Sequence, residues 1–240
     1  MINFFRTYLH QFGLVNGLRL LLMRIVRRLL DRYQNEYYSQ TGEDIIIDYI
    51  LDKPKGFYID VGCHHPVKIS KTYRLYKKGW TGLNIDANPN LIKEFRRIRP
   101  RDISRCDAIS NIKEERTFYE FHQDAVSTIN QSVLEEWKMK WDLKSERTVD
   151  TKTLNQILEE ENISRPIDLL SIDVEGHDYQ VLSSMDLSKH KPYLIIIEMH
   201  NFDIIHPDDN QIYRHLIENQ YRLIGYVLMN GYFLYSPEIS

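Results

Sequence analysis

The sequence predicts an α/β fold with a mostly parallel sheet that ends in an antiparallel hairpin. From residue 56 onward, short apolar runs alternate with helical stretches, a pattern typical of right-handed βαβ units. The run YLIIIE at 193–198 is the most apolar and indicates a buried strand. Near the C-terminus, Asn230-Gly231 suits a type I′ turn, which predicts a hairpin over 221–236 closed at this dipeptide.

The elements follow from apolar runs and from the residues that end them. A strand at 56–62 stops at Gly62, and a helix at 70–78 stops at Gly79. A threonine-rich segment precedes and caps the helix at 153–161. Further strands are expected at 82–86, 103–109, 116–121, 146–149, 167–173 and 193–198. Further helices are expected at 43–51, 90–98, 132–142, 178–186 and 209–219.

Length and composition limit the class of protein. The chain has 240 residues, 42% hydrophobic and 27% charged, which suits one large α/β domain and argues against disorder, collagen and coiled coil. A net charge of −3 argues against a nucleic-acid binder that relies on bulk charge. Two cysteines are too few for a disulfide scaffold or a cysteine zinc site, so we expect a reducing, cytoplasmic setting.

A basic extension precedes the main domain. Residues 1–36 carry six arginines against two acidic side chains, a net charge of +4, which leaves −7 for 37–240. Within the extension, 14–30 predicts an amphipathic helix, and its arginines argue against a membrane-spanning one. Two interpretations stay open. The helix packs on its own domain or on a second copy in a homo-oligomer, or it contacts the cytoplasmic face of an anionic membrane.

Acidic side chains follow each strand of the predicted parallel sheet, where ligands bind in this architecture. The first turn has a single glycine, Gly62, so it lacks the dinucleotide fingerprint, and no phosphate-binding P-loop is present. Asp86 comes 24 residues later, at the end of the second strand, where a carboxylate can accept hydrogen bonds from ribose hydroxyls. A nucleoside ligand without pyrophosphate, such as S-adenosylmethionine, fits best.

Five motifs, in order, resemble one family. They are DVGCHHP at 60–66, SKT at 70–72, GWTG at 79–82, IDANP at 85–89 and IDVEGH at 172–177, with a lead-in of Ser39-Gln40 and Gly42-Glu43-Asp44. This pattern resembles the FkbM family of S-adenosylmethionine-dependent methyltransferases over about residues 38–200. The resemblance implies a Rossmann-like class I methyltransferase fold and O-methylation, commonly of sugars or polyketide-derived products. Two departures are Cys63, often Ala in the family, and Lys71, often Asn.

The resemblance also implies cofactor-binding residues. Asp60 and Gly62 would border the methionine portion, Asp86 would hold the ribose, and Asp107 and Ala108 would flank the adenine. Residues expected near the cofactor with less specific roles are Ser39, Gln40, His64 and Thr72. Ser39 and Gln40 have a structural alternative, since they precede the helix at 43–51 and can cap it.

Methyl transfer to a hydroxyl oxygen calls for a base or a metal. Asp173, Glu175 and His177 alternate after the fourth strand of the parallel sheet, and Glu198 and His200 repeat this spacing after the fifth. We predict Asp173, Glu175 and His200 as catalytic residues, with Asp173 or His200 as base. Asp173 and Glu198 are predicted ligands of a Mg²⁺ or Mn²⁺ ion. Alternatively, Glu175 and His177 cap the following helix.

The remaining predictions concern the insertion at 122–142 and the rival functions. Ser127 and Thr128 could reach the substrate, whereas Trp137 and Trp141 share a helix face that we expect to pack into a core rather than stack on a sugar. The sequence leaves two rivals to a methyltransferase that acts on a saccharide or glycan. One is an inactive cofactor-binding module, and the other is a metal-dependent hydrolase that uses the same catalytic residues.

Overall fold

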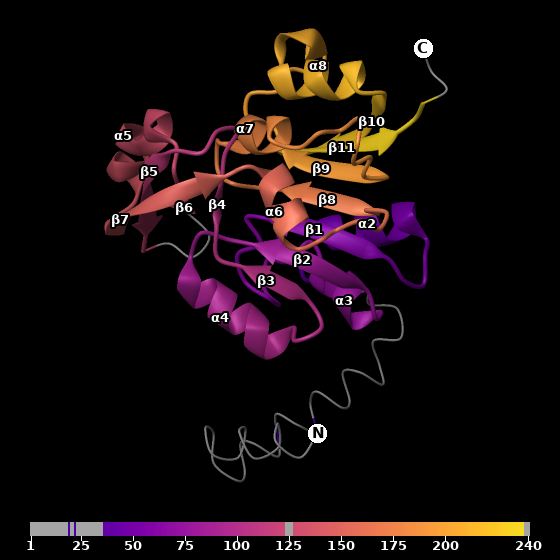
Figure 1. Ribbon diagram of the computed structural model, residues 1–240, viewed down its shortest axis with the longest axis horizontal. Helices are drawn as coiled ribbons and strands as arrows, with labels where there is room; N and C mark the ends of the chain where they lie inside the picture. The colour runs from indigo at the N-terminus through magenta and orange to yellow at the C-terminus, as the bar shows by residue number, and fades with distance from the viewer. Residues whose placement is uncertain (1–18, 20–21, 23–35, 123–126, 238–240) are drawn as a thin grey trace. The chain divides into compact units, whose positions relative to one another are not determined.

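The computed structural model describes residues 19, 22, 36–122 and 127–237 (Figure 1). The chain divides into two units, residues 1–36 and 37–240, and the strands and helices named below lie in the second. The predicted amphipathic helix at 14–30 lies outside the described residues, apart from Arg19 and Leu22. Within the described ranges, no helix has the length and apolar character needed to cross a membrane.

A seven-stranded sheet in the order β10-β11-β9-β8-β1-β2-β3 forms the centre of this unit (Figure 1). Five neighbouring strands are parallel, β11 runs antiparallel to β9, and β10 runs antiparallel to β11. The predicted α/β fold with a mostly parallel sheet is therefore confirmed. The strands are β1 (Phe57–Val61), β2 (Thr81–Ile85), β3 (Ile103–Arg105), β8 (Leu169–Ile172), β9 (Leu194–Glu198), β10 (Tyr221–Val227) and β11 (Asn230–Tyr235).

Helices cover both faces of this sheet because its central strands are apolar on both sides. On one face, Ile59 and Ile195 pack with α6 (Leu154–Glu160), α7 (Asp178–Ser183) and α8 (Gln211–Glu218). On the other, Tyr58 and Ile196 pack with α2 (Glu43–Leu51) and α3 (Tyr73–Lys77). The helix α4 (Pro89–Ile98) lies beside β3 at the sheet edge. The result is a three-layer sandwich whose strand ends stay open.

A smaller sheet, in the order β4-β7-β5-β6, begins with the strand that follows β3 along the chain. It comprises β4 (Ala108–Ile109), β5 (Glu115–Phe121), β6 (Ser127–Thr128) and β7 (Leu143–Lys152), with α5 (Gln131–Lys140) packed on it. Trp137 is 8% exposed and lies against Phe121 and Trp141, with ring centroids 5.9 and 5.3 Å away. The prediction that the tryptophan stripe faces a core is confirmed.

The predicted single strand at 103–109 is wrong. It divides into β3 and β4, which belong to different sheets, and Cys106 and Asp107 lie between them. Arg105 and Lys152 form ion pairs with the Asp107 carboxylate at 2.9 and 3.3 Å, so the chain turns from one sheet to the other at this residue. The segment contains no glycine or proline that would mark this turn in the sequence.

The predicted hairpin forms, but its closure at Asn230-Gly231 is wrong. The turn is Leu228-Met229, because Val227 pairs with Asn230. Leu228 takes the left-handed conformation, with φ of 56°, that Asn-Gly usually provides. Asn230 instead lies in β11 opposite Glu198, with its side chain near the sheet edge that carries the acidic residues.

Candidate functional site

The strand order reverses between β1 and β8, and a cleft of about 270 Å³ opens at their carboxyl ends. The two strands pair one-to-one, Tyr58–Val61 with Leu169–Ile172, and the Asp173 amide continues the ladder by donating to the Val61 carbonyl at 3.0 Å. This pairing brings the turn after β1 against the backbone after β8. Gly62 takes φ of 76°, and a Cβ there would lie 1.7 Å from the Asp173 carbonyl oxygen.

Replacing Gly62 by alanine is expected to lower the free energy of unfolding by about 3 kcal/mol, because strain in φ adds to a backbone clash. Gly79→Ala is the matched control. Gly79 also has positive φ, 95°, but a Cβ there would meet nothing within 4 Å, so we expect a loss of about 1 kcal/mol. Urea unfolding measures both. Equal losses of unfolding free energy in the two variants would show that the nearby Asp173 backbone does not restrict the side chain at position 62.

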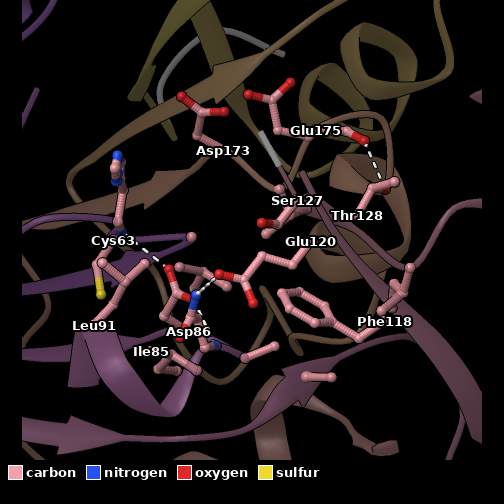
Figure 2. A pocket seen from close by; sticks show the side chains of 18 of the residues that line it. Cys63, Ile85, Asp86, Leu91, Phe118, Glu120, Ser127, Thr128, Asp173 and Glu175 are labelled. Atoms are coloured by element: carbon pink, nitrogen blue, oxygen red, sulfur yellow. Dashed lines mark hydrogen bonds between the residues drawn. The ribbon is translucent and has the colours of Figure 1, made fainter. Parts of the chain in front are cut away.

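Asp86 presents its carboxylate to the cleft (Figure 2). The backbone amides of His64 and Asn88 donate to it at 3.0 and 2.7 Å. Burial raises the pKa of Asp86 to about 6, although these two amides oppose the shift. The carboxylate is thus held by the turn after β1 and by the turn after β2. His64, which has φ of 50°, lines the same cleft.

Asp60 lines the cleft from β1, and a buried network fixes it. The Thr72 hydroxyl donates to its carboxylate at 2.7 Å, and burial raises the pKa of Asp60. Thr72 does not itself line the cleft, but its hydroxyl contacts Asp60, which does. Arg99 donates to the Thr72 hydroxyl at 2.9 Å and draws it inward.

Arg99 is a residue that the sequence analysis missed. Its side chain is fully buried, and it also donates to the Pro66 carbonyl at 2.7 Å and the Ser70 hydroxyl at 2.6 Å. A buried guanidinium with this many partners fixes geometry, because no other side chain offers five fixed donors. These bonds hold 66–72 in irregular backbone, so the predicted helix at 70–78 begins only at Tyr73.

The lead-in segment contributes one of its two predicted residues to the cleft. Gln40 lines it, but Ser39 does not. The Ser39 hydroxyl donates to the Asp44 carboxylate at 2.7 Å and accepts from the Asp44 amide at 3.2 Å. Ser39 therefore supports the first turn of α2, as the structural alternative supposed, although Gly42 is the N-cap residue.

The smaller sheet forms the far wall of the cleft (Figure 2). Asp107 and Ala108 line it, together with the aromatic ring of Phe118 and the carboxylate of Glu120. Lys144 donates to Glu120 at 2.5 Å, and their attraction lowers the pKa of that carboxylate, although burial opposes the shift. Phe118 and Glu120 were not predicted from the sequence. The alternating polar pattern of β5 does not show where this strand lies in the fold.

The loop after β8 brings two more acidic side chains to the cleft. Asp173 and Glu175 both line it, although the strand ends at Ile172, so the expected alternation through His177 is wrong. Glu175 has φ of 57°. The Thr128 hydroxyl donates to the Glu175 carbonyl at 3.0 Å, and the predicted substrate contacts Ser127 and Thr128 both line the cleft.

The structure does not support the alternative in which the side chains of Glu175 and His177 cap the following helix. His177 is the N-cap residue of α7 but its side chain makes no cap hydrogen bond, and its ring instead contacts the Ser110 hydroxyl at 3.0 Å. Asp178 closes the loop, because its carboxylate accepts from the amides of Val174 and Gly176 at 2.9 and 3.0 Å. The Glu175 carboxylate is thereby left to the cleft.

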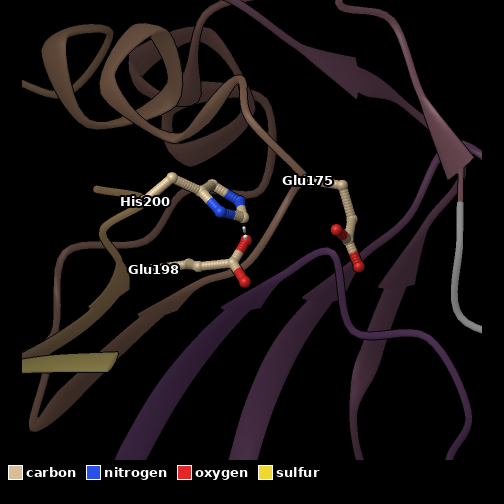
Figure 3. A group of neighbouring side chains, drawn as sticks. All are labelled: Glu175, Glu198 and His200. Atoms are coloured by element: carbon tan, nitrogen blue, oxygen red, sulfur yellow. Dashed lines mark ion pairs between the residues drawn. The ribbon is translucent and has the colours of Figure 1, made fainter. Parts of the chain in front are cut away.

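The ionisable side chains after β8 and β9 form one cluster (Figure 3). His200 contacts Glu198 at 3.0 Å, and one carboxylate oxygen of Glu175 lies within 4.8 Å of both. Burial raises the pKa of Glu175 to about 8, and neighbouring carboxylates add to the shift. The hydrogen bond that the protonated ring donates to Glu198 raises the pKa of His200 to about 9. At neutral pH His200 is therefore a cation and a donor, which disfavours the predicted base role.

Lys71 is the second departure from the family pattern, and it adds a cation to the site. Its ammonium donates to the Asp173 carboxylate and to the Asn230 side-chain oxygen, both at 2.9 Å. The attraction of Asp173 raises its pKa, although burial opposes the shift. Lys71 and Asn230 therefore fix Asp173 at the rim of the cleft.

The cleft has the chemistry of a nucleoside site that also takes a positive charge. Carboxylates from Asp60, Asp86 and Glu120 suit ribose hydroxyls and a cation, and Phe118 supplies an apolar ring surface. The fold and this cleft define a class of α/β transferases whose donor binds at the strand switch point. The Methyltransferase FkbM domain matches residues 60–223, so the chain belongs to the FkbM methyltransferase family. No curated protein matches the chain significantly.

Membership of this family makes the protein a methyltransferase and implies S-adenosylmethionine as its methyl donor. The residues fit that molecule, since a nucleoside with a sulfonium needs hydroxyl acceptors and negative charge, and the cleft offers both. The sequence-predicted residues that line the cleft are Gln40, Asp60, Gly62, His64, Asp86, Asp107, Ala108, Asp173 and Glu175. Their individual roles stay predictions.

Proposed function

We propose that this protein transfers a methyl group from S-adenosylmethionine to a hydroxyl oxygen of a sugar or glycan. The observation that supports oxygen as the acceptor atom is the Glu175 carboxylate, held in the cleft beside Glu198 and His200. A hydroxyl is a poor nucleophile until a base takes its proton. Neutral amines and thiolates have less need of such a group.

Glu175 is the base in this proposal, because its pKa of about 8 lies close to the operating pH. Its left-handed backbone conformation is the kind of strain that accumulates at functional sites. Asp173, fixed by Lys71, orients the acceptor hydroxyl, and protonated His200 donates a hydrogen bond to an acceptor oxygen. Bound S-adenosylmethionine supplies an electrophilic methyl group on positively charged sulfur.

Labelled methyl donor tests the proposal directly. The purified chain is incubated with methyl-labelled S-adenosylmethionine and a panel of methyl glycosides, phenols, primary amines and carboxylic acids. We expect label in a glycoside as an alkali-stable methyl ether. Label in an amine, or an alkali-labile ester, would contradict O-methylation of a sugar. Tight cofactor binding without turnover would favour the inactive module, and hydrolysis without cofactor affinity would favour the hydrolase.

The predicted Mg²⁺ or Mn²⁺ ion can be tested with the same assay. Oxygens of Asp173, Asp178 and Glu198 lie within 4.8 Å of one another, a spacing that a metal could use. Each carboxylate nevertheless has its own partner: the Lys71 ammonium, two backbone amides, and the His200 ring. We expect EDTA treatment to change turnover by less than about twofold, since these partners already offset the charges. A larger loss that Mg²⁺ restores would establish the metal.

A further inference from the structure

A second hollow, of about 450 Å³, lies beyond the ionisable cluster, in the segment that follows β9. The loop from His200 to Asn210, which includes the 3₁₀ turn η1 (Pro207–Asp209), and the first turn of α8 form it. Polar side chains line this hollow, among them Asn201, Asp203, His206, Asp209 and Arg214. None of these residues lines the donor cleft, so the hollow is separate from it.

His200 connects the hollow to the donor cleft. The residue lines the hollow, and its ring is 3.0 Å from Glu198 and within 4.8 Å of the Glu175 carboxylate. Glu175 in turn lines the donor cleft. The His200 ring therefore lies between the lining of the hollow and the Glu175 carboxylate of the donor cleft.

The lining selects the kind of molecule that binds. Lipids and aromatic acceptors need apolar walls, whereas the lining of the hollow is mostly polar. The carboxylates of Asp203 and Asp209 line the hollow together with the guanidinium of Arg214, so no excess positive charge favours a phosphate. A sugar unit presents hydroxyls that both donate and accept, which matches this mixture of acceptors and donors.

Hydrogen bonds within the protein hold several side chains of the hollow in place without a ligand. The Asp203 carboxylate accepts from the Ile205 amide at 2.8 Å, and the Asn210 side chain caps α8 by accepting from the amides of Ile212 and Tyr213 at 2.9 and 3.1 Å. Arg214 donates to the Asp208 carbonyl. Each of these bonds uses part of the side chain's capacity and leaves other oxygens or N–H groups for a ligand.

We propose that this polar hollow is the acceptor site, that it binds a neutral saccharide unit, and that it presents one hydroxyl of that unit to Glu175. The inference rests on the proposed function and adds to it the place where the acceptor binds and the residues that select it. Asp203 and Arg214 are its specificity-determining residues.

Saccharide binding is measured on the full chain saturated with S-adenosylhomocysteine, so that no turnover occurs. The probes are methyl glycosides of glucose, galactose, mannose, rhamnose and N-acetylglucosamine, titrated by saturation-transfer NMR. We expect at least one to bind, and Asp203→Asn and Arg214→Gln each to weaken it about five- to tenfold, the loss of one or two hydrogen bonds. Asp208→Asn and Arg222→Gln are matched controls outside the lining. All four variants should bind S-adenosylhomocysteine as the natural chain does.

The outcomes separate this inference from the function on which it rests. A glycoside that is methylated by the natural chain and bound equally by all variants would overturn the hollow as the acceptor site and leave sugar O-methylation intact. Methylation of a phenol or a long-chain alcohol, with no glycoside bound, would overturn the saccharide assignment and the sugar substrate together. Weaker S-adenosylhomocysteine binding in Asp203→Asn or Arg214→Gln would show that the two sites are not separate.

Discussion

Asp86→Asn is expected to weaken S-adenosylmethionine binding about a hundredfold. Hydrogen bonds to a charged group contribute about 1.5–3 kcal/mol each, and the Asp86 carboxylate is predicted to accept from two ribose hydroxyls. The substitution keeps the shape of the side chain and one acceptor oxygen. The amides of His64 and Asn88 donate to different carboxylate oxygens, so one of them loses its acceptor, and we expect the free energy of unfolding to fall by about 1–3 kcal/mol as well. Isothermal titration calorimetry measures the affinity, with Asp150→Asn, an exposed carboxylate on β7, as the control.

A modified ligand tests whether ribose is the partner. An S-adenosylhomocysteine that lacks the 2′-hydroxyl should bind the natural chain more weakly than the intact ligand does. It should bind Asp86→Asn with little further loss, because the interaction is already gone. Full additivity of the two losses would mean that Asp86 contacts some other part of the cofactor.

The same carboxylate predicts a pH dependence. With a pKa of about 6, Asp86 is ionised in roughly nine molecules in ten at pH 7 and one in ten at pH 5, so affinity should fall about tenfold between these values. The unfolded chain loses this proton near pH 4. The folded protein therefore holds a proton that the unfolded chain has lost, and stability from this group declines as pH rises from about 4 to about 6. Asp86→Asn should show neither trend.

The order of elements in the large sheet could be predicted because each strand is a separate apolar run. YLIIIE at 193–198 became β9 because such a run can be buried only between two helical layers. The smaller sheet could not be predicted as a whole, since its strands pair across long sequence separations and β7 alternates exposed and half-buried residues. The turn at Leu228-Met229 escaped prediction because tertiary pairing of Asn230 with Glu198 outweighed the local preference of Asn-Gly.

Some residues of the candidate site could be predicted from the sequence and others could not. Asp60, Gly62 and Asp86 could be placed from sequence because they lie at or just after the ends of strands, and parallel strands end at one edge. Arg99 and Lys71 could not, since their importance lies in partners distant in the sequence, such as Pro66 for Arg99 and Asn230 for Lys71. Nor could sequence show that His200 carries a proton, because that depends on a 3.0 Å contact with buried Glu198.

Glu175→Gln is expected to lower kcat about 100- to 10,000-fold, the usual range for removal of a general base. The isosteric amide keeps the loop bonds at the Glu175 backbone, so cofactor affinity should change little. Glu218→Gln, an exposed glutamate at the end of α8, is the control. In the natural chain, kcat/KM for the methyl donor should rise with pH through a value near 8, because only the carboxylate form accepts a proton. A pH profile that Glu175→Gln leaves unchanged would assign the base elsewhere.

As pH rises towards 8, the stability of the folded protein should fall while its activity rises. The folded pKa of Glu175, about 8, lies above its ordinary value of 4.5, so the folded protein retains a proton that the unfolded chain releases. Stability from this group is complete below about pH 4.5 and is lost as pH rises to about 8. Above pH 8, Glu175→Gln should therefore be more stable than the natural chain by about 1–3 kcal/mol, a range reduced for partial solvent exposure. A variant that is slower and more stable at pH 9, yet equal in stability to the natural chain at pH 4, would identify Glu175 as a carboxylate kept in an unfavourable place for catalysis. Equal unfolding free energies at both pH values would show that its charge is not strained, and the proposed base would lose its physical basis.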